Sequence, residues 1–498
     1  MLRTLLFCSL SFLSFGCSGK AEEPAPVWPT LQAPPPPPQE VPEDAEAQDP
    51  ADRPDIILIV ADDMGAGDWQ VGNPKLTTPN LMSLCDEGVR LDRYYTLPLC
   101  TPTRTAMLTG QSPLPFHMAF SPMRRWEDRA IPQDVDLLPE YLKEAGYATG
   151  IIGKWHLGHR ETWMLPNQRG FDYFYGFLTG AIHYFTHKSG NAGLDWQRNG
   201  ESLDEKGYTT TLFGDDAARW IAAQEQEQPL FLYLPFNAPH SPTMAPAEFT
   251  APFKDAFPDL GRRRYCGMVS AMDQSIGKVL AAVEERGKAE NTLIIFVSDN
   301  GASIRENGSN GPLRGTKGTV FEGAIRTPGV VKWPGRIPVG VESPQLVDVR
   351  DWFPTILIAA GVDVPEAAIG MDVIPTLSQT SEDEATARRG DLFYASNIAS
   401  YLSYAMIRWP YKCVVRVRHK TGKTERQLYR LDLDPLEKEN LRTSEPQRLG
   451  EMEEAILDWF AEALPGERFE SPVEIRPNPS PDDWEEPADW TAPPPLKR

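Results

Sequence analysis

Four short runs of mostly apolar residues constrain the fold of this chain more than any other feature. The first, Asp55-Ile56-Ile57-Leu58-Ile59-Val60, is apolar and largely β-branched after its aspartate. Such a run is typical of a strand buried on both faces of a parallel sheet. The other three runs are 147–153, 229–235 and 292–298.

Segments with helical character separate these runs. We expect helices over 81–87, 137–145, 215–224 and 264–286. Strands that alternate with helices predict an α/β fold, in which a mostly parallel sheet is sandwiched by helices. Residues 160–200 are aromatic and glycine-rich, and we expect a long loop region that walls a pocket.

The pattern changes near Asp391. Short segments at 392–394, 404–408, 412–418 and 427–431 favour antiparallel strands, with a turn at Thr421-Gly422 and a helix over about 446–464. We therefore predict a main domain over 54–390, a smaller C-terminal α+β subdomain with an antiparallel sheet over 391–469, and a low-order tail over 470–498.

The N-terminal residues indicate export. A mostly apolar run follows Met1-Leu2-Arg3, is too short to span a bilayer, and marks residues 1–17 as a signal peptide. Gly16-Cys17 resembles a bacterial lipoprotein cleavage site, although Ser14 and Phe15 depart from that pattern, so a lipid on Cys17 and simple cleavage both stay open. Residues 18–53 are rich in Pro and Glu and predict a disordered linker. We expect a periplasmic, outer-membrane-anchored or extracellular protein if the source is bacterial.

Charge and cysteine usage exclude several classes of protein. The formal net charge of −21 argues against a nucleic-acid partner and gives no reason to expect binding to an anionic membrane surface. Of the six cysteines, four lie outside the leader, widely scattered and without a CxxC pair. The sequence therefore indicates neither a zinc cluster nor a disulfide framework.

The stretch from Leu99 to Gly110 predicts an anion-binding helix end. Thr101 can serve as the N-cap and Pro102 suits the first helical position, so a helix is expected to begin here with Cys100 at its positive end. Arg104 would lie one turn further along, on the side of Cys100. A buried structural cysteine and a surface arginine are the alternative reading.

Polar residues follow each of the four apolar runs, where the strands of an open α/β sheet place a ligand. They are Asp62-Asp63, Lys154 with His156, His240, and Asp299-Asn300. The Asp and Asn side chains are hard oxygen ligands suited to Ca²⁺ or Mg²⁺. Lys154 and His156 would share one face of an extended segment, and Lys317 lies in a glycine-rich loop that an anion can approach. Each of these residues alone also fits an ordinary solvated or structural role.

The motifs together resemble the type I sulfatase family, over roughly residues 54–465. The matching segments are Cys100-x-Pro102-x-Arg104, Asp62-Asp63, 153–158, 299–301, 313–318, Glu322-Gly323, 351–361, 428–429 and 432–441. Gly170-Phe171-Asp172 and the aromatic segment after it look closest to the arylsulfatase B-like, N-acetylgalactosamine-4-sulfatase-like branch. Ala324 stands where a second glycine is common in the family.

The resemblance implies an alkaline phosphatase/sulfatase-like fold and a formylglycine made from Cys100 during export by a formylglycine-generating enzyme. The hydrated aldehyde would attack the ester sulfur and later expel sulfate. Asp62, Asp63, Asp299, Asn300 and the modified Cys100 would hold one Ca²⁺, with Mg²⁺ the lesser alternative. Arg104 would orient the nucleophile, and Lys154 and Lys317 would clamp the sulfate. His156 would act as base, and His240 would assist the leaving alkoxide.

These features predict a hydrolase of sulfuric esters, acting on aryl sulfates in vitro and on sulfated sugars in nature. A phosphonate monoester or phosphodiester hydrolase of the same superfamily is the alternative, because the same metal chemistry serves phosphoryl transfer. A non-catalytic binding protein is the second alternative, although it would require a missing catalytic group and none is missing.

Overall fold

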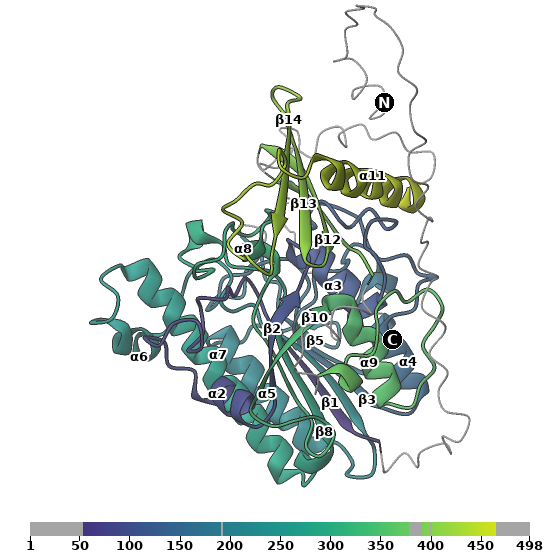
Figure 1. Ribbon diagram of the computed structural model, residues 1–498. Coiled ribbons are helices and arrows are strands. Elements are labelled where there is room, and N and C mark those ends of the chain that lie inside the picture. The colour runs from purple at the N-terminus through teal and green to yellow at the C-terminus, as the bar shows by residue number, and fades with distance from the viewer. Residues whose placement is uncertain (1–52, 191–192, 378–389, 399, 465–498) are drawn as a thin grey trace, which may run out of the picture.

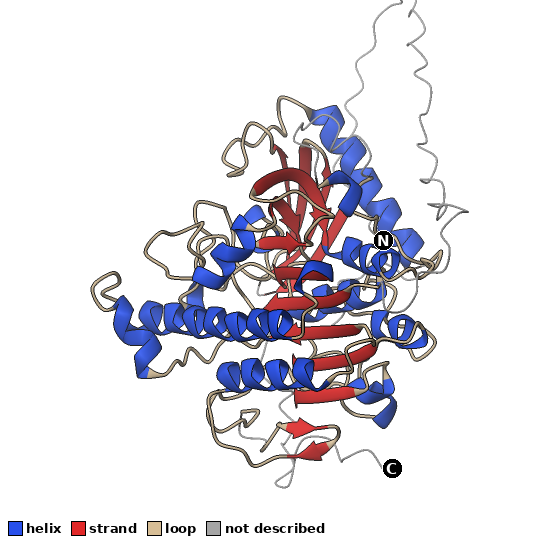
Figure 2. Ribbon diagram, turned by 90° about the horizontal axis from the view of Figure 1, so that it is seen from below, coloured by secondary structure: helices blue, strands red, loops and turns tan. Residues whose placement is uncertain are grey.

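The computed structural model describes residues 53–190, 193–377, 390–398 and 400–464. The predicted signal peptide, nearly all of the linker, and the tail lie outside these ranges. The described residues form a ten-stranded sheet and a separate four-stranded sheet (Figures 1 and 2).

The centre of the large sheet consists of parallel strands. In order they are β8 (Thr292–Ser298), β1 (Asp55–Ala61), β7 (Leu230–Pro235), β3 (Ala148–Lys154) and β4 (Tyr173–Phe177). The first four of these are the four predicted apolar runs, lying side by side. Their mostly apolar character follows from burial on both faces, since every residue of β1, β3, β7 and β8 is buried.

The edges of the large sheet were not predicted. On one side lie β9 (Gly329–Lys332), β2 (Val89–Tyr95) and β10 (Val341–Asp348); on the other lie β5 (Gln197–Arg198) and β6 (Glu201–Ser202). β9 runs antiparallel to both β8 and β2, and β5 runs antiparallel to β4 and to β6. The sheet is therefore mixed at its edges and parallel at its centre.

Helices cover both faces of this sheet, as predicted. Ile56, Leu58 and Val60 of β1 share a core with α3 (Cys100–Thr109), α4 (Leu138–Glu144) and α9 (Trp352–Ala359). Ile57 and Ile59 point to the other face, in a core with α2 (Pro79–Asp86), α5 (Thr209–Ala223) and α7 (Leu260–Glu285). Each such side chain stabilises the fold by roughly 1.5–3 kcal/mol through burial.

The segment 160–200 is more ordered than expected. It holds the strand β4 against β3, although Gly176 in its middle reads as a strand breaker in the sequence. A Cβ at Gly176 would lie 2.0 Å from the backbone oxygen of Gly153, so only glycine permits this close approach. The prediction of a long loop region is therefore wrong where β4 lies, but Thr179 and Ser189 of this segment do line a cavity.

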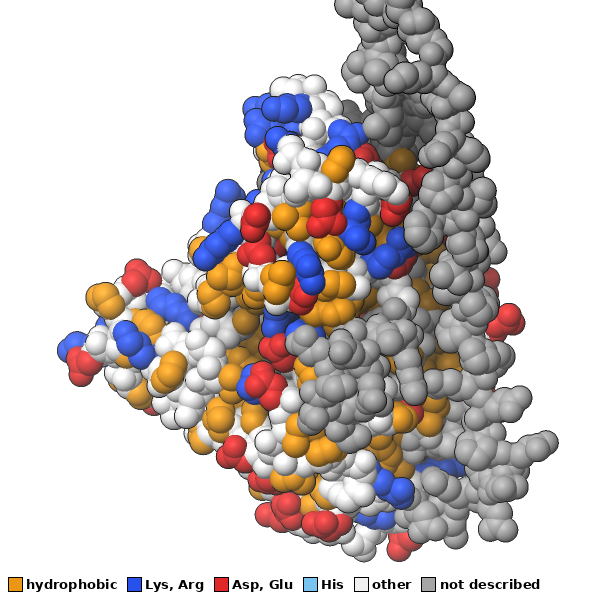
Figure 3. Space-filling model, in the orientation of Figure 1, with side chains coloured by type: hydrophobic (Ala, Val, Ile, Leu, Met, Phe, Trp, Pro, Cys, Tyr) orange, Lys and Arg blue, Asp and Glu red, His pale blue; other side chains and the backbone are white. Residues whose placement is uncertain are grey.

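The C-terminal sheet matches its prediction. The antiparallel strands are β11 (Leu392–Ile398), β12 (Tyr401–Arg408), β13 (Tyr411–Arg418) and β14 (Thr424–Arg430). The helix α11 (Pro446–Ala463) packs on one face of the sheet, and the other face joins the core of the large sheet. Lys and Arg side chains gather at the exposed tip between β13 and β14 (Figure 3).

Short helices complete the described chain. They are α6 (Ala247–Thr250) and α8 (Glu322–Ile325), with single 3₁₀ turns at Thr162–Met164, Pro166–Gln168, Ala251–Phe253, Ala289–Asn291, Ile304–Glu306, Val349–Asp351 and Ile374–Thr376. Within the described ranges, none of the helices combines the length and the apolar character that a bilayer crossing requires.

Candidate active site

Two neighbouring strands bring the predicted acidic residues together. Ala61 of β1 pairs with Ser298 of β8, so the residues that follow each strand emerge side by side. The backbone N–H of Asp63 donates to Asp299 Oδ1 at 3.1 Å, and Asn300 Nδ2 donates to Asp63 Oδ1 at 2.7 Å. All of these side chains are buried at the carboxyl edge of the sheet.

The helix α3 delivers Cys100 to this edge. The helix begins at Cys100 itself, with Leu99 as the N-cap residue and without a side-chain cap, so the prediction of Thr101 as N-cap is wrong. The Thr101 hydroxyl instead accepts a hydrogen bond from the Met123 backbone at 3.0 Å. Gly110 closes the helix in the left-handed conformation, with a φ of 66°.

Three cations neutralise three carboxylates in the site. Arg104 Nη2 donates to Asp299 Oδ2 at 2.8 Å. Lys154 Nζ lies 2.7 Å from Asp62 Oδ2, and Lys317 Nζ lies 2.7 Å from Asp63 Oδ1.

These pairs set the charge states of the buried acids. Burial raises the pKa of Asp62, but Lys154 and the other nearby cations outweigh it, so its net pKa falls below the usual value. Burial, with the charge of Asp62 near by, raises the pKa of Asp299. Burial alone would lower the pKa of Lys317. The charge of Asp63 outweighs burial, so the pKa of Lys317 is raised and its ammonium stays charged.

Three oxygens in this cluster have no hydrogen-bond partner. They are Asp62 Oδ1, Asp63 Oδ2 and Asn300 Oδ1, all buried. A buried acceptor without a partner costs about 1–3 kcal/mol. In addition, ligand atoms from Asp62, Cys100 and Asp299 all lie within 4.8 Å of one another. Hard oxygens that converge without partners fit a divalent cation of the Ca²⁺ or Mg²⁺ type.

His156 leaves the strand in a turn. Its φ of 60° is left-handed, so the prediction that 154–156 is extended, with Lys154 and His156 on one face, is wrong. Lys154 bonds Asp62 beneath the cavity, whereas the His156 ring lies in the cavity wall, with Nε2 2.8 Å from the Met123 carbonyl. Burial, with Lys154 near by, holds the pKa of His156 well below its usual value.

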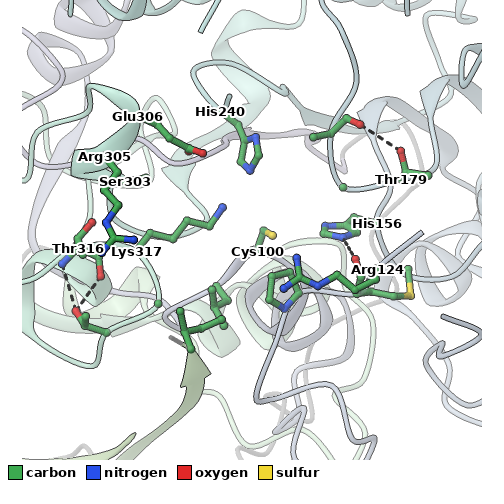
Figure 4. Close-up of a pocket in the computed structure, with 18 of the residues that line it drawn as sticks. Cys100, Arg124, His156, Thr179, His240, Ser303, Arg305, Glu306, Thr316 and Lys317 are labelled. Atoms are coloured by element: carbon green, nitrogen blue, oxygen red, sulfur yellow. Dashed lines mark hydrogen bonds between the residues drawn. The ribbon is translucent and has the colours of Figure 1, made fainter. Parts of the chain in front are cut away.

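His240 lies on the opposite side of the cavity, in a loop after β7 (Figure 4). Its Nδ1 lies 2.6 Å from the Ser241 carbonyl, which can only accept, so Nδ1 carries a proton. Nε2 is left for the cavity side, 3.7 Å from Asp63 Oδ2. The ring can therefore exchange a proton at Nε2.

A cavity of about 670 Å³ opens above these groups. Cys100, His156, His240 and Lys317 of the predicted site lie in its wall, with the Lys317 ammonium directed toward Cys100 (Figure 4). The other predicted residues lie beneath it, fully buried: Asp62, Asp63, Arg104, Lys154, Asp299 and Asn300.

The cavity wall also contains residues that the sequence did not single out. They include Arg124, Thr179, Arg305, Glu306 and Arg416. These residues come from loops and from the C-terminal sheet, and no motif spacing links them. Arg305 and Glu306 closely follow the Asp299-Asn300-Gly301 motif, and Arg124 lies one loop beyond α3, where the basic pair at 124–125 was a signal that the sequence offered.

A parallel sheet that gathers a hard-cation cluster, a helix N-terminus and charged lysines at its carboxyl edge defines an α/β enzyme built for an anionic ester. The chain belongs to the sulfatase family: the sulfatase family model matches residues 54–362. The model for the C-terminal part of N-sulphoglucosamine sulphohydrolase matches residues 316–457. The predicted family is thereby confirmed, whereas the 4-sulfatase-like branch stays a prediction.

Individual relatives agree with this assignment. The chain is 36% identical to mouse arylsulfatase J over 336 residues, which are 66% of this chain but only 56% of that protein. It is 35% identical to the N-acetylgalactosamine-6-sulfatase of the dog over 382 residues, covering 70% of this chain and 71% of the relative. The crystal structure of Ps i-CgsB superposes with a TM-score of 0.75 at 30% identity, covering 83% of this chain and 94% of that one.

Proposed function

We propose that this protein hydrolyses sulfate esters, using a formylglycine made from Cys100 and a bound Ca²⁺. The observation that carries the proposal is the position of Cys100. It lies at the N-terminus of a buried helix, in the cavity wall, among ligand atoms of Asp62 and Asp299. The three unpartnered oxygens of the acidic cluster support the cation.

The two groups supply chemistry that the side chains lack. A cation held by Asp62, Asp63, Asp299 and Asn300 supplies a Lewis acid that polarises sulfate oxygens and acidifies the nucleophile. Formylglycine at position 100 supplies a hydrated aldehyde as nucleophile, which a thiol cannot replace.

The remaining residues bind the sulfate and move protons. Lys317 lies in the cavity wall beside Asp63 and donates to a sulfate oxygen. His240 Nε2 faces the cavity and, when protonated, stabilises the leaving alkoxide. His156 remains neutral at ordinary pH, since burial lowers its pKa, and so accepts a proton near residue 100. Arg104 and Lys154 hold Asp299 and Asp62 in place.

We infer that the natural substrates are sulfated sugars. One relative is an N-acetylgalactosamine-6-sulfatase, and Ps i-CgsB has been crystallised with k-i-k-neocarrahexaose. A cavity of about 670 Å³ has room for a saccharide in addition to the sulfate. Export through residues 1–17, with either a lipid on Cys17 or simple cleavage, and maturation by a formylglycine-generating enzyme belong to the same proposal.

The test uses protein purified from its native host and the variant Cys100→Ala. Mass spectrometry of the peptide containing residue 100 is expected to find an aldehyde, and the protein is expected to release sulfate from an aryl sulfate and from sulfated sugars. Cys100→Ala is expected to release none. An unmodified thiol in active protein, or faster turnover of a phosphonate monoester or phosphodiester than of any sulfate ester, would contradict the proposal.

A further inference from the structure

The outer part of the cavity carries a positive charge that the reaction centre does not use. Among the described residues that line the cavity, four are arginines, whereas Glu306 is the single acidic one. The whole chain has a formal net charge of −21, so this concentration of arginine does not follow from composition. A basic lining attracts and holds anionic groups.

The C-terminal sheet supplies one of these arginines. Ser403 of β12 and Arg416 of β13 are directly paired, and both line the cavity together with Tyr401. In both strands the alternate residues, such as Leu402 and Val415, pack toward α11. Because side chains alternate between the two faces of a strand, Tyr401, Ser403 and Arg416 lie on the face toward the cavity.

Arg416 is held in place by stacking instead of by a close acid. Its guanidinium lies 3.7 Å from the centroid of the Tyr401 ring. The carboxylate of Glu425 is 3.6 Å away, which is longer than a hydrogen bond. The side chain is 18% exposed, and burial together with the charges of Arg314 and Arg418 lowers its pKa. An anion at Arg416 would relieve this excess of positive charge.

Two further arginines lie on either side of the reaction centre. Arg305 lies on the side of Lys317, and Arg124 on the side of His156 (Figure 4). The scissile sulfate already has Lys317 and the proposed cation as partners, so it does not need these groups. The arginines therefore suit charges elsewhere on the substrate.

We propose that the cavity binds a saccharide with at least two anionic groups, and that Arg416 recognises the group that is not cleaved. This inference rests on the proposed sulfatase activity. The recognised group is a sulfate ester or a carboxylate, since the planar guanidinium pairs with both. Arg416 acts in substrate selection, at a distance from the bond that breaks.

The test compares three saccharides with the same scissile sulfate. One carries no other charge, one carries a second sulfate, and one carries a uronic carboxylate. Arg416→Met keeps an apolar contact with Tyr401 and removes the charge. Arg430→Met is the matched control, because Arg430 lies on β14 of the same sheet, is 43% exposed and does not line the cavity. Thermal unfolding of each variant checks that the fold is retained.

For the wild type we expect kcat/KM to be higher for at least one doubly anionic saccharide than for the singly charged one. Arg416→Met is expected to lower that kcat/KM about 10–100-fold, mainly through KM, and to change the value for the singly charged saccharide less than about twofold. Arg430→Met is expected to behave as wild type. Equal loss on all three saccharides, or no preference in the wild type, would overturn the proposal.

A binding measurement separates this proposal from the activity. Calorimetry with Cys100→Ala is expected to give a lower Kd for a doubly anionic saccharide, and adding Arg416→Met is expected to remove the difference. Selective binding without sulfate release by the wild type would refute the proposed activity and support the subsite. Sulfate release without Arg416-dependent selectivity would support the activity and refute the subsite.

Discussion

Arg104 and Asp299 are joined by two hydrogen bonds, from Nε and Nη2 to the same oxygen Oδ2, at 3.1 and 2.8 Å. Both side chains are fully buried. Arg104 belongs to α3 and Asp299 follows β8, so this contact fixes the helix that carries Cys100 to the strand end that carries a proposed cation ligand. The nucleophile position and the cation position are therefore set by one buried ion pair.

Replacing Arg104 should destabilise the protein strongly. Arg104→Met leaves the Asp299 carboxylate buried without its partner, which is expected to lower the free energy of unfolding by about 3–5 kcal/mol. Chemical denaturation measures the change. The matched control is Arg90→Met, since Arg90 and Glu342 form an ion pair with side chains 28% and 46% exposed. The control is expected to cost at most about 1 kcal/mol, and equal losses in both variants would contradict the prediction.

Removing divalent cations should reduce both stability and activity. Asp62 Oδ1, Asp63 Oδ2 and Asn300 Oδ1 then lose the partner we assign to them. Dialysis against a chelator is expected to lower the Tm and sulfate release together, and Ca²⁺ is expected to restore both at lower concentration than Mg²⁺. A cation at 100 times its Kd stabilises the fold by about 2.7 kcal/mol. If metal analysis shows complete removal while Tm and activity are unchanged, the cation site is refuted.

The centre of the fold was predictable because complete burial leaves an unambiguous pattern. Strands β8, β1, β7 and β3 are covered on both faces, so most residues in them are apolar. The strand β2, next to the edge strand β10, has the sequence VRLDRYY, which mixes charged and apolar residues, and no apolar run marks it. Pairing at these edges depends on long-range contacts that local patterns do not encode.

The site was predictable to the same degree and for a related reason. The carboxyl ends of parallel strands lie at one edge of a sheet, so Asp62 and Asp299 could be expected in one site, but the direct pairing of β1 with β8 could not be read from sequence order. The left-handed turn at His156 could not, because it depends on where the chain leaves the sheet. The sequence also could not predict that Arg416 lines the same cavity as Cys100, because the two residues lie more than 300 positions apart in the chain.

His156 should make stability depend on pH. Burial lowers the pKa of His156 below 6.5 in the folded protein, while the unfolded chain titrates near about 6.5. As the pH falls below 6.5, the unfolded state takes up the proton first, so this group lowers stability toward acid. We expect the free energy of unfolding to fall less steeply below pH 6.5 in His156→Gln than in the wild type. The exposed-site variant His419→Gln should keep the wild-type slope; an unchanged slope in His156→Gln would contradict the prediction.

Lys412 should be essential for attaching the C-terminal sheet. It lies on β13, fully buried, 2.9 Å from Glu322 Oε1 of α8 and 2.9 Å from Glu437 Oε1. Lys412→Met would leave two buried carboxylates facing each other, and is expected to lower the free energy of unfolding by about 3–5 kcal/mol. Arg408→Met is the control, since its ion pair with Asp391 is half-exposed. A loss below about 1 kcal/mol for Lys412→Met, measured by denaturant unfolding, would show that this network does not hold the sheet.

Gly180 offers a test of how tightly the His156 ring must be positioned. A Cβ at Gly180 would lie 2.6 Å from His156 Nε2 and 2.7 Å from Cε1, so Gly180→Ala must displace the ring from the Met123 carbonyl. A shift of this size in the proposed base is expected to lower kcat about 10–100-fold. Gly450→Ala, where no atom lies within 4 Å of the added Cβ, is the matched control and should keep the wild-type kcat. Gly180 has no left-handed φ, so the cost of Gly180→Ala falls on the His156 ring and not on the backbone, and a folded variant with wild-type kcat would show that His156 does not act from this position.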